Sequence, residues 1–344
     1  MKHISRRILT WKFYFYELLL PSLGSLAPAR ADAIVRTMGW ASTYLRPGRR
    51  ARLKAAMARA AAILGTRGAA EAGWTALAET AARFTARDYP LDGVGDDDAL
   101  ARFEVIGFEA VREALDRGRG AILVGSHLGA HIAGMHWLFR RGLPVRALVQ
   151  RPKHVSRELN RRFDASAAPY AQSEFFLKRD LTTAAAVERM MQARSALRDG
   201  LAVYLNGDIV WEGSNTRTCR LLGRDHEFLA VWAELACLTR APVFFIFCRH
   251  LPAGRFALEF RALAPESLSR PEHALAAYLA EVEAQVAVDP SEAVAYLTWP
   301  CYTEAPEAGD ADPPRRDAGD PSPPRPQALR AADAATLARS SARR

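Results

Sequence analysis

The pattern of apolar and polar positions changes near residue 100. Before that point, Ala-rich segments separated by polar breaks predict helices over residues 31–45, 50–64 and 69–86, followed by a loop over residues 88–98. After it, short apolar runs alternate with longer helical stretches. This alternation predicts an α/β domain with a largely parallel central sheet flanked by helices.

The predicted elements of this domain follow one another closely. The apolar runs predict strands over residues 103–106, 121–125, 145–149, 175–177, 201–205, 242–248 and 256–260, the last as an edge strand. The stretches between and after them predict helices over residues 108–117, 127–141, 155–165, 182–198, 228–239 and 272–288. Ser126 is the expected N-cap of the helix that follows the second strand.

The first 28 residues combine basic, apolar and aromatic side chains. Basic residues precede an apolar stretch that approaches the length of a membrane span, about 20 residues, but Lys12, Glu17 and Pro21 interrupt it. Five aromatic residues lie between positions 11 and 16, a composition typical of bilayer interfaces. We expect residues 1–28 to form an interfacial anchor within an N-terminal helical, membrane-proximal region. The alternatives are a true span and an amphipathic helix packed on the core.

Composition changes again after residue 303. Residues 304–344 are rich in Pro, Ala, Asp and Arg and hold almost no large apolar side chain, so they are predicted to be disordered. The predicted organisation is therefore an anchor over 1–28, a helical region over 29–99, the α/β domain over 100–303 and this tail.

The chain carries a net charge of +9, from 47 Lys and Arg against 38 Asp and Glu. This excess favours an acidic partner, such as an anionic lipid or an acidic protein. We expect no nucleic-acid partner, because no known nucleic-acid module accompanies the charge. Eight basic residues form a run that could dock an acidic protein or anionic headgroups, or could simply be solvated. They are Arg140, Arg141, Arg146, Arg151, Lys153, Arg157, Arg161 and Arg162.

Polar side chains follow two of the predicted strands. His127 comes just after the strand over 121–125, and Asp208 just after the strand over 201–205. The carboxyl ends of parallel strands share the edge of a sheet where ligands bind, so the two side chains could face one cleft. A histidine can take a proton near neutral pH, and a carboxylate beside it would orient the ring. A structural histidine and a turn-capping aspartate are the plainer alternatives.

Arginines near strand ends are the candidate substrate-binding residues. Arg217 and Arg220 lie in a polar segment, Arg249 directly follows the strand over 242–248, and Arg151 belongs to the basic run. Guanidinium groups can clamp phosphate or carboxylate oxygens in a bidentate manner. Arg249 is favoured, because its strand ends at the same edge as His127. Each arginine could instead be a solvated surface residue.

Five stretches together resemble the bacterial lipid A biosynthesis acyltransferase family, within the lysophospholipid acyltransferase superfamily. They are residues 117–129, 201–208, 221–223, 233–242 and 290–299. The resemblance implies transfer of a fatty acyl group from a thioester, on acyl carrier protein or coenzyme A, to a hydroxyl of a lipid or glycolipid, without a cofactor. It also implies a location at the cytoplasmic face of the bacterial inner membrane, peripheral or anchored by the N-terminus. In the family motif, a histidine followed four residues later by Asp or Glu, His127 takes the role of general base.

The sequence departs from this motif at the acid. After four intervening residues the position is Ile132, which can neither orient nor polarise an imidazole. Another carboxylate, Asp208 or Asp225, could replace the acid, or His127 could work alone. The third alternative is a catalytically degenerate family member that binds lipid or a protein partner.

Two histidines near the motif also allow a metal site as an alternative. His127 and His131 have the spacing of a zinc pair on a helix, but Leu128 stands where a metalloprotease motif has Glu. No third ligand is evident nearby. We therefore expect no metal.

Overall fold

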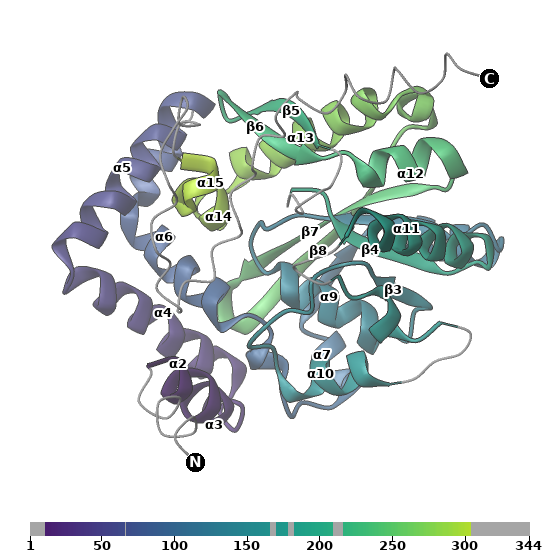
Figure 1. The fold of residues 1–344 in the computed structure, drawn as a ribbon. Helices are drawn as coiled ribbons and strands as arrows, with labels where there is room; N and C mark the ends of the chain where they lie inside the picture. Colours follow the sequence, from purple (N-terminus) through teal and green to yellow (C-terminus); the bar gives the residue numbers. More distant parts are fainter. Residues whose placement is uncertain (1–10, 66, 166–169, 178–181, 209–215, 304–344) are drawn as a thin grey trace, which may run out of the picture.

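The computed structural model describes residues 11–65, 67–165, 170–177, 182–208 and 216–303 (Figure 1). The predicted tail over 304–344 and the first ten residues of the predicted anchor lie outside this part of the chain. The division of the chain into an anchor, a helical region, an α/β domain and a tail stays a prediction.

A six-stranded sheet in the order β1-β8-β7-β2-β4-β3 occupies the centre of the molecule. Its strands are β1 (Phe103–Ile106), β2 (Ala121–Gly125), β3 (Val145–Ala147), β4 (Ala202–Asn206), β7 (Val243–Leu251) and β8 (Arg255–Ala262). All neighbouring pairs are parallel except β7 and β8. The predicted α/β fold with a largely parallel sheet flanked by helices is confirmed.

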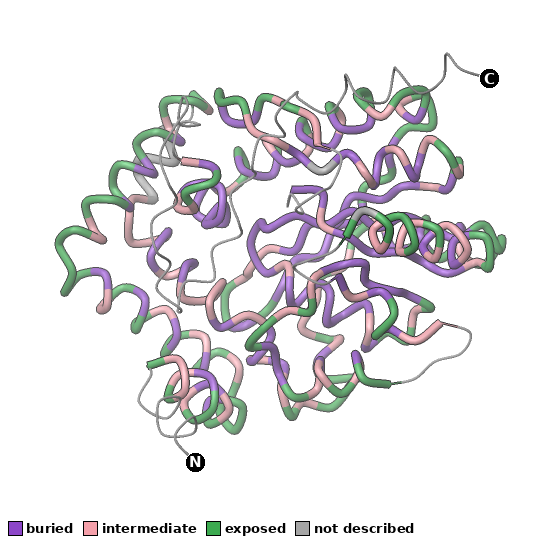
Figure 2. The backbone as a smooth tube through the Cα atoms, viewed as in Figure 1, coloured by how far each residue is buried: buried purple, intermediate pink, exposed green. Residues whose placement is uncertain are grey.

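Two layers of helices cover the sheet (Figure 1). One face packs against α8 (Phe108–Asp116), α9 (His131–Arg140) and α10 (Arg157–Asp164), and the other against α11 (Thr183–Arg198), α12 (Val231–Thr239) and α13 (Pro271–Val288). Side chains of a strand alternate between faces, so Ile122 and Val124 of β2 join one core and Ala121 and Leu123 the other. Every residue of β2 is buried, as the continuous apolar run predicted, and Figure 2 shows that buried residues gather at the centre of the molecule.

The N-terminal region is helical, as predicted, with α4 (Pro28–Tyr44), α5 (Pro47–Leu64) and α6 (Arg67–Ala86). Before them come α2 (Trp11–Phe13), the π-helix η1 (Tyr14–Leu19) and α3 (Leu20–Leu23). Tyr16, Leu20 and Leu23 are buried in a small core of their own with residues of α4. Within the described residues, no helix combines the length and the apolar character needed to cross a bilayer.

Several predicted elements were wrong in position or type. The strand over 256–260 is not at an edge, because β7 and β8 form a hairpin across η4 (Pro252–Gly254) and β1 pairs with the outer side of β8. Residues 172–175 form the 3-10 turn η3 (Gln172–Phe175), and Leu177 makes only a single bridge to Gln150. The predicted loop over 88–98 contains the 3-10 turn η2 (Tyr89–Leu91) and the start of α7 (Asp96–Leu100).

A two-stranded hairpin of β5 (Thr216–Leu221) and β6 (Arg224–Leu229) was not predicted. Its first strand is mostly polar and only partly buried, so it lacks the apolar run that marked the central strands. After α13 the chain continues through η6 (Pro290–Glu292), α14 (Val294–Thr298) and α15 (Pro300–Thr303). In Figure 1 this last segment lies beside α5 and the β5–β6 hairpin.

Candidate active site

The carboxyl ends of β2 and β4 bring His127 and Asp208 together. Gly125 of β2 pairs with Asn206 of β4, so His127 and Asp208 each lie two residues beyond the same rung of the sheet. Asp208 accepts hydrogen bonds from the His127 main-chain N–H, with Oδ2 at 2.5 Å, and from Nδ1, with Oδ1 at 2.8 Å. The strand pattern predicted that the two side chains share one edge of the sheet, and in the structure they are in direct contact.

Two tyrosines hold Asp208 from the other side. The Tyr296 hydroxyl donates to Oδ2 at 2.6 Å, and the Tyr302 hydroxyl donates to the main-chain oxygen of Asp208. Burial by itself would raise the pKa of the Asp208 carboxyl, but His127 and the Tyr296 hydroxyl outweigh it and lower the pKa below the ordinary value of 3.8. Asp208 is therefore ionised at neutral pH.

The ionised carboxylate settles which nitrogen of His127 carries the proton. A carboxylate can only accept, so Nδ1 is the protonated nitrogen of the neutral ring and Nε2 keeps a free lone pair. No described residue hydrogen-bonds to Nε2, and the His127 side chain remains 10% exposed. The arrangement can accept a proton at Nε2 and stabilise the imidazolium that results, as the aspartate of a serine-protease triad does.

The loop over residues 126–130, which carries His127, is fixed by bonds to distant segments. The main-chain N–H of Gly129 donates to the Glu292 carbonyl at 2.9 Å, and that of Ala130 donates to the Cys248 carbonyl at 2.7 Å. Gly129 has φ +56°, and a Cβ there would lie 2.4 Å from the Cys248 oxygen, so only glycine suits this position. The predicted helix over 127–141 was therefore wrong at its start: α9 begins at His131.

Ser126 does not act as the N-cap, because Ala130 occupies that position. Its buried hydroxyl has no hydrogen-bond partner among the described residues. The later start of α9 also removes the helical spacing that made His127 and His131 resemble a zinc pair. In the described part of the chain, no group of three His, Cys, Asp or Glu side chains could hold a metal ion.

Aromatic rings flank the imidazole of His127. The ring of His131 lies 4.7 Å away and that of Trp299 5.4 Å away, between centroids, and Phe84 contacts both. Burial, then the proximity of His127 and of Arg87, lower the pKa of His131 well below its ordinary value, so this second ring is neutral. His127 is therefore the imidazole with a carboxylate partner, and His131 serves as part of its wall.

A second histidine–carboxylate pair braces the same loop. The buried Glu292 accepts from the main-chain N–H of His250 at 3.1 Å and contacts its Nδ1 at 3.0 Å. Its own carbonyl accepts from Gly129. Glu292 therefore ties the end of β7 to the loop that carries His127.

Among the described residues, neither position 132 nor Asp225 supplies a carboxylate to His127. Ile132 is buried in the core on the side of α8 to α10. Asp225 is exposed on β6 opposite Arg220, and within the described residues it has no bond to His127. Asp208 is the carboxylate that contacts His127.

The structure brings Asp208 to His127, but it places the predicted arginines in ion pairs or at the surface. Arg249 pairs with Glu259 at 2.8 Å, Arg217 lies 3.5 Å from Glu272, and Arg151 pairs with Asp164 at 2.8 Å. Arg220 is exposed on β5. Three of the four guanidiniums thus already have carboxylate partners, which sequence reasoning could not see because those partners lie on other elements.

The basic run over residues 140–162 is not one continuous charged surface. Arg140 is buried and donates to His136 and to main-chain carbonyls of Leu91 and Val94, and Arg146 is buried too. These two therefore cannot dock a partner. Arg141, Lys153 and Arg157 are exposed and have no carboxylate partner within the described part. Any docking role would fall to them.

Sequence reasoning missed the residues that complete the site. Tyr296, Trp299 and Glu292 lie in the stretch over 290–299, which contributed to the family resemblance without suggesting a role for any single residue. Tyr302 lies just beyond it. The only signal that could have drawn attention to them was the aromatic content of this stretch.

A comparison with known protein families gives a match over most of the chain. The model of the family "Bacterial lipid A biosynthesis acyltransferase" matches residues 2–294. The match includes His127, Asp208 and Glu292. No curated protein matches the chain.

Proposed function

The chain belongs to the bacterial lipid A biosynthesis acyltransferase family, and from this premise we propose that it moves a fatty acyl group from a thioester to a hydroxyl of a lipid or glycolipid. The donor is acyl carrier protein or coenzyme A. His127 is the general base and Asp208 the residue that orients it. The proposed substrate-binding roles of Arg151, Arg217 and Arg249 would require their present ion pairs to rearrange, whereas Arg220 is exposed on β5.

The proposed reaction uses the free nitrogen of His127. As the acceptor hydroxyl attacks the thioester carbonyl carbon, its proton passes to Nε2 and the new C–O bond forms. The tetrahedral oxyanion then collapses, the C–S bond breaks, and the thiolate leaves with the proton from Nε2. Asp208 stabilises the imidazolium between these steps.

One observation carries the proposal: the 2.8 Å contact between His127 Nδ1 and Asp208 Oδ1. It supplies the acid that the family motif has and that this sequence lacks at Ile132. A carboxylate that arrives from another strand favours the catalytic interpretation over the catalytically degenerate one. The aromatic wall around the ring is the feature that would suit a binding protein instead.

The proposed place of action is the cytoplasmic face of the bacterial inner membrane. The N-terminal helices bury Tyr16 but leave Trp11 61% and Leu18 54% exposed. An aromatic and apolar outer face of this kind suits peripheral attachment in the interfacial region of a bilayer.

The test is transfer of a labelled acyl chain from acyl carrier protein or coenzyme A into total bacterial lipids. We expect transfer by the wild type and a loss of at least about 10²-fold in His127→Ala, the range that general base catalysis supplies. His273→Ala, which removes an exposed histidine of α13, is the control and should retain activity. Absence of transfer from both donors, in protein shown to be folded, would instead favour the lipid- or partner-binding alternative.

A further inference from the structure

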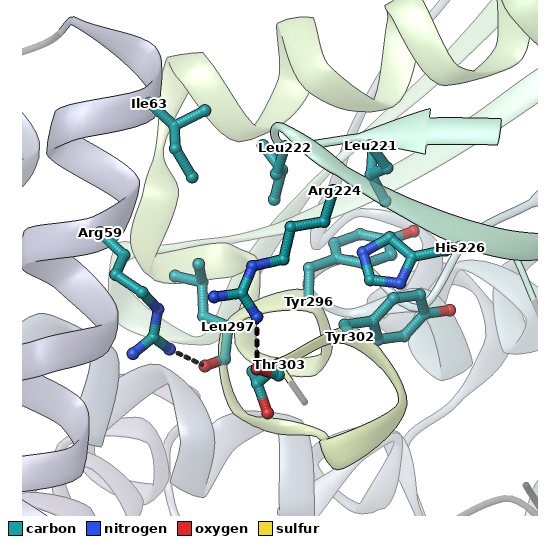
Figure 3. Close-up of a pocket in the computed structure, with 10 residues that line it drawn as sticks. All are labelled: Arg59, Ile63, Leu221, Leu222, Arg224, His226, Tyr296, Leu297, Tyr302 and Thr303. Carbon is teal, nitrogen blue, oxygen red and sulfur yellow. Dashed lines mark hydrogen bonds between the residues drawn. The ribbon is translucent and has the colours of Figure 1, made fainter. Parts of the chain in front are cut away.

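A pocket lies on the Asp208 side of the histidine–aspartate pair, between α5, the β5–β6 hairpin and the turn from α14 to α15 (Figure 3). Tyr296 and Tyr302 form part of its wall, and both hydroxyls bond to Asp208. The side chains of Tyr296 and Tyr302 thus lie between the pocket and Asp208. A ligand in the pocket would lie close to Asp208, on the side of the pair that faces away from Nε2 of His127.

Two guanidinium groups converge on this pocket. Figure 3 shows Arg59 of α5 and Arg224 of β6 both directed toward the turn that holds Leu297 and Thr303. Arg59 donates to the Leu297 carbonyl at 3.5 Å and Arg224 to the Thr303 carbonyl. Neither has a carboxylate within ion-pair distance in the described part of the chain, so most of their five donors each remain available.

These two arginines differ from those that the sequence suggested. Arg217, Arg249 and Arg151 already pair with carboxylates. Burial lowers the pKa of His226, which also lines the pocket, so this ring is neutral and the positive charge comes from the arginines alone. Two guanidiniums that line one pocket, with no carboxylate partner among the described residues, favour one anion with several oxygens.

The remaining wall is apolar. Ile63, Leu221, Leu222 and Leu297 contribute hydrocarbon surface; Ile63 is 48% exposed, whereas the three leucines are buried. A polar sugar or a free inorganic anion would leave this surface uncovered. The combination of two cations with an apolar wall matches a phosphate ester that continues into hydrocarbon.

We propose that this pocket binds the phosphate end of an anionic lipid acceptor. The guanidiniums of Arg59 and Arg224 hold the phosphate oxygens, and Ile63 and Leu222 cover the first carbons of the lipid. The assignment of this lipid as the acceptor rests on the proposed acyl transfer, whereas binding itself does not. Both thioester donors also carry phosphate, on a polar pantetheine arm that would gain less from the apolar wall.

Binding is measured on full-length His127→Ala protein, which cannot turn over by the proposed route. The probe is dihexanoyl phosphatidic acid below its micellar concentration, titrated by calorimetry, with dihexanoylglycerol and inorganic phosphate as reference ligands. We expect phosphatidic acid to bind tightest and Arg59→Gln/Arg224→Gln to weaken it by about tenfold or more, since charge-assisted bonds contribute this much. The matched control Arg112→Gln/Arg119→Gln removes the same charge from exposed positions before β2 and should bind as the parent does.

Two results would overturn the site. One is unchanged phosphatidic acid binding in the Arg59→Gln/Arg224→Gln protein, and the other is equal binding of the uncharged diacylglycerol. In protein with His127 intact, the same double substitution should raise the KM of the acceptor and leave that of the donor unchanged. A rise in the donor KM alone would assign the pocket to the phosphopantetheine arm and refute the acceptor. If no protein shows transfer, the proposed reaction fails while the binding result stands.

Discussion

His127 and His136 each lie beside a buried aspartate, but the two rings differ in what reaches their other nitrogen. Nδ1 of His127 is 2.8 Å from Asp208, and Nδ1 of His136 is 3.0 Å from Asp88, there as a close contact rather than an aligned hydrogen bond. Nε2 of His136 accepts from Arg140 Nε at 2.9 Å and its side chain is fully buried. Nε2 of His127 has no described partner, and its side chain is 10% exposed.

This difference separates a reactive pair from a structural one. Asp88 also accepts from the hydroxyl of Ser156 at 2.6 Å, and Arg140 donates to the main chain of the segment before α7. The His136 network therefore joins three segments and leaves no nitrogen available to a substrate. The same residue types become candidates for catalysis only where one nitrogen is oriented and the other is left open at the edge of the sheet.

The largest expected effect is that of Asp208→Asn on catalysis. The amide cannot stabilise an imidazolium and would favour the wrong tautomer of His127, so transfer should fall by about 10²- to 10⁴-fold. Single-turnover transfer at saturating donor measures this, with circular dichroism to verify folding. A rate within twofold of the wild type would show that His127 works without its acid.

The mirror experiment is His136→Ala, which should affect stability rather than chemistry. Removing the fully buried imidazole leaves a cavity and takes one partner each from Asp88 and Arg140, although Arg140 keeps its ion pair with Asp96; the expected cost is about 3–5 kcal/mol in the free energy of unfolding. Urea denaturation measures this, while transfer per folded molecule should stay near the wild-type rate. The contrast between the two pairs would disappear if His136→Ala instead lowered turnover of fully folded protein.

Ile132→Glu restores the acid of the family motif and sharpens the comparison further. Ile132 packs in the core, so an unpaired carboxylate there should cost about 2–4 kcal/mol of stability. Nδ1 of His127 is already engaged by Asp208, so no gain in transfer is expected. Ile132→Met is the volume-matched control. Rescue of Asp208→Asn by Ile132→Glu would show that the helical position can reach the ring after all.

The smallest effect is expected for Tyr296→Phe. Folding lowers the pKa of Asp208, so this carboxylate adds stability that is fully present above the ordinary pKa of 3.8 and is lost as the pH falls through the folded value. Loss of the Tyr296 hydroxyl should cost about 1 kcal/mol and move the acid-unfolding midpoint to higher pH.

Tyr302→Phe is the matched control for this substitution, since its hydroxyl bonds the main-chain oxygen of Asp208 rather than the carboxylate. It should lower stability without moving the acid midpoint. Equal shifts in both variants would mean that the acid transition does not report on Asp208.

Sequence patterns located the main strands and the edge at which they end. A continuous apolar run such as residues 121–124 is typical of a strand that is covered on both faces of a sheet. They placed His127 and Asp208 on one edge for the same reason. They could not show that the two side chains touch, since that depends on the register in which Gly125 meets Asn206.

The errors arise where distant contacts override local preference. The loop over 126–130 has apolar residues that would suit a helix, but bonds to Glu292 and Cys248 and the left-handed backbone of Gly129 keep it irregular until His131. The substrate role of Arg249 could not be judged without Glu259, ten residues away on the neighbouring strand. Likewise, no local pattern connects Tyr296 with Asp208, 88 positions earlier.

The bonds that fix this loop also bear on its dynamics. Strand β7 runs past the end of β2, and the Cys248 carbonyl accepts from the loop as it would from another strand. Amides held in this way exchange with solvent only when the sheet itself opens. The amide hydrogen of Ala130 should therefore exchange as slowly as those of the central strands, and the proposed base would be presented by a segment that is irregular in shape yet rigid over the lifetime of a catalytic cycle.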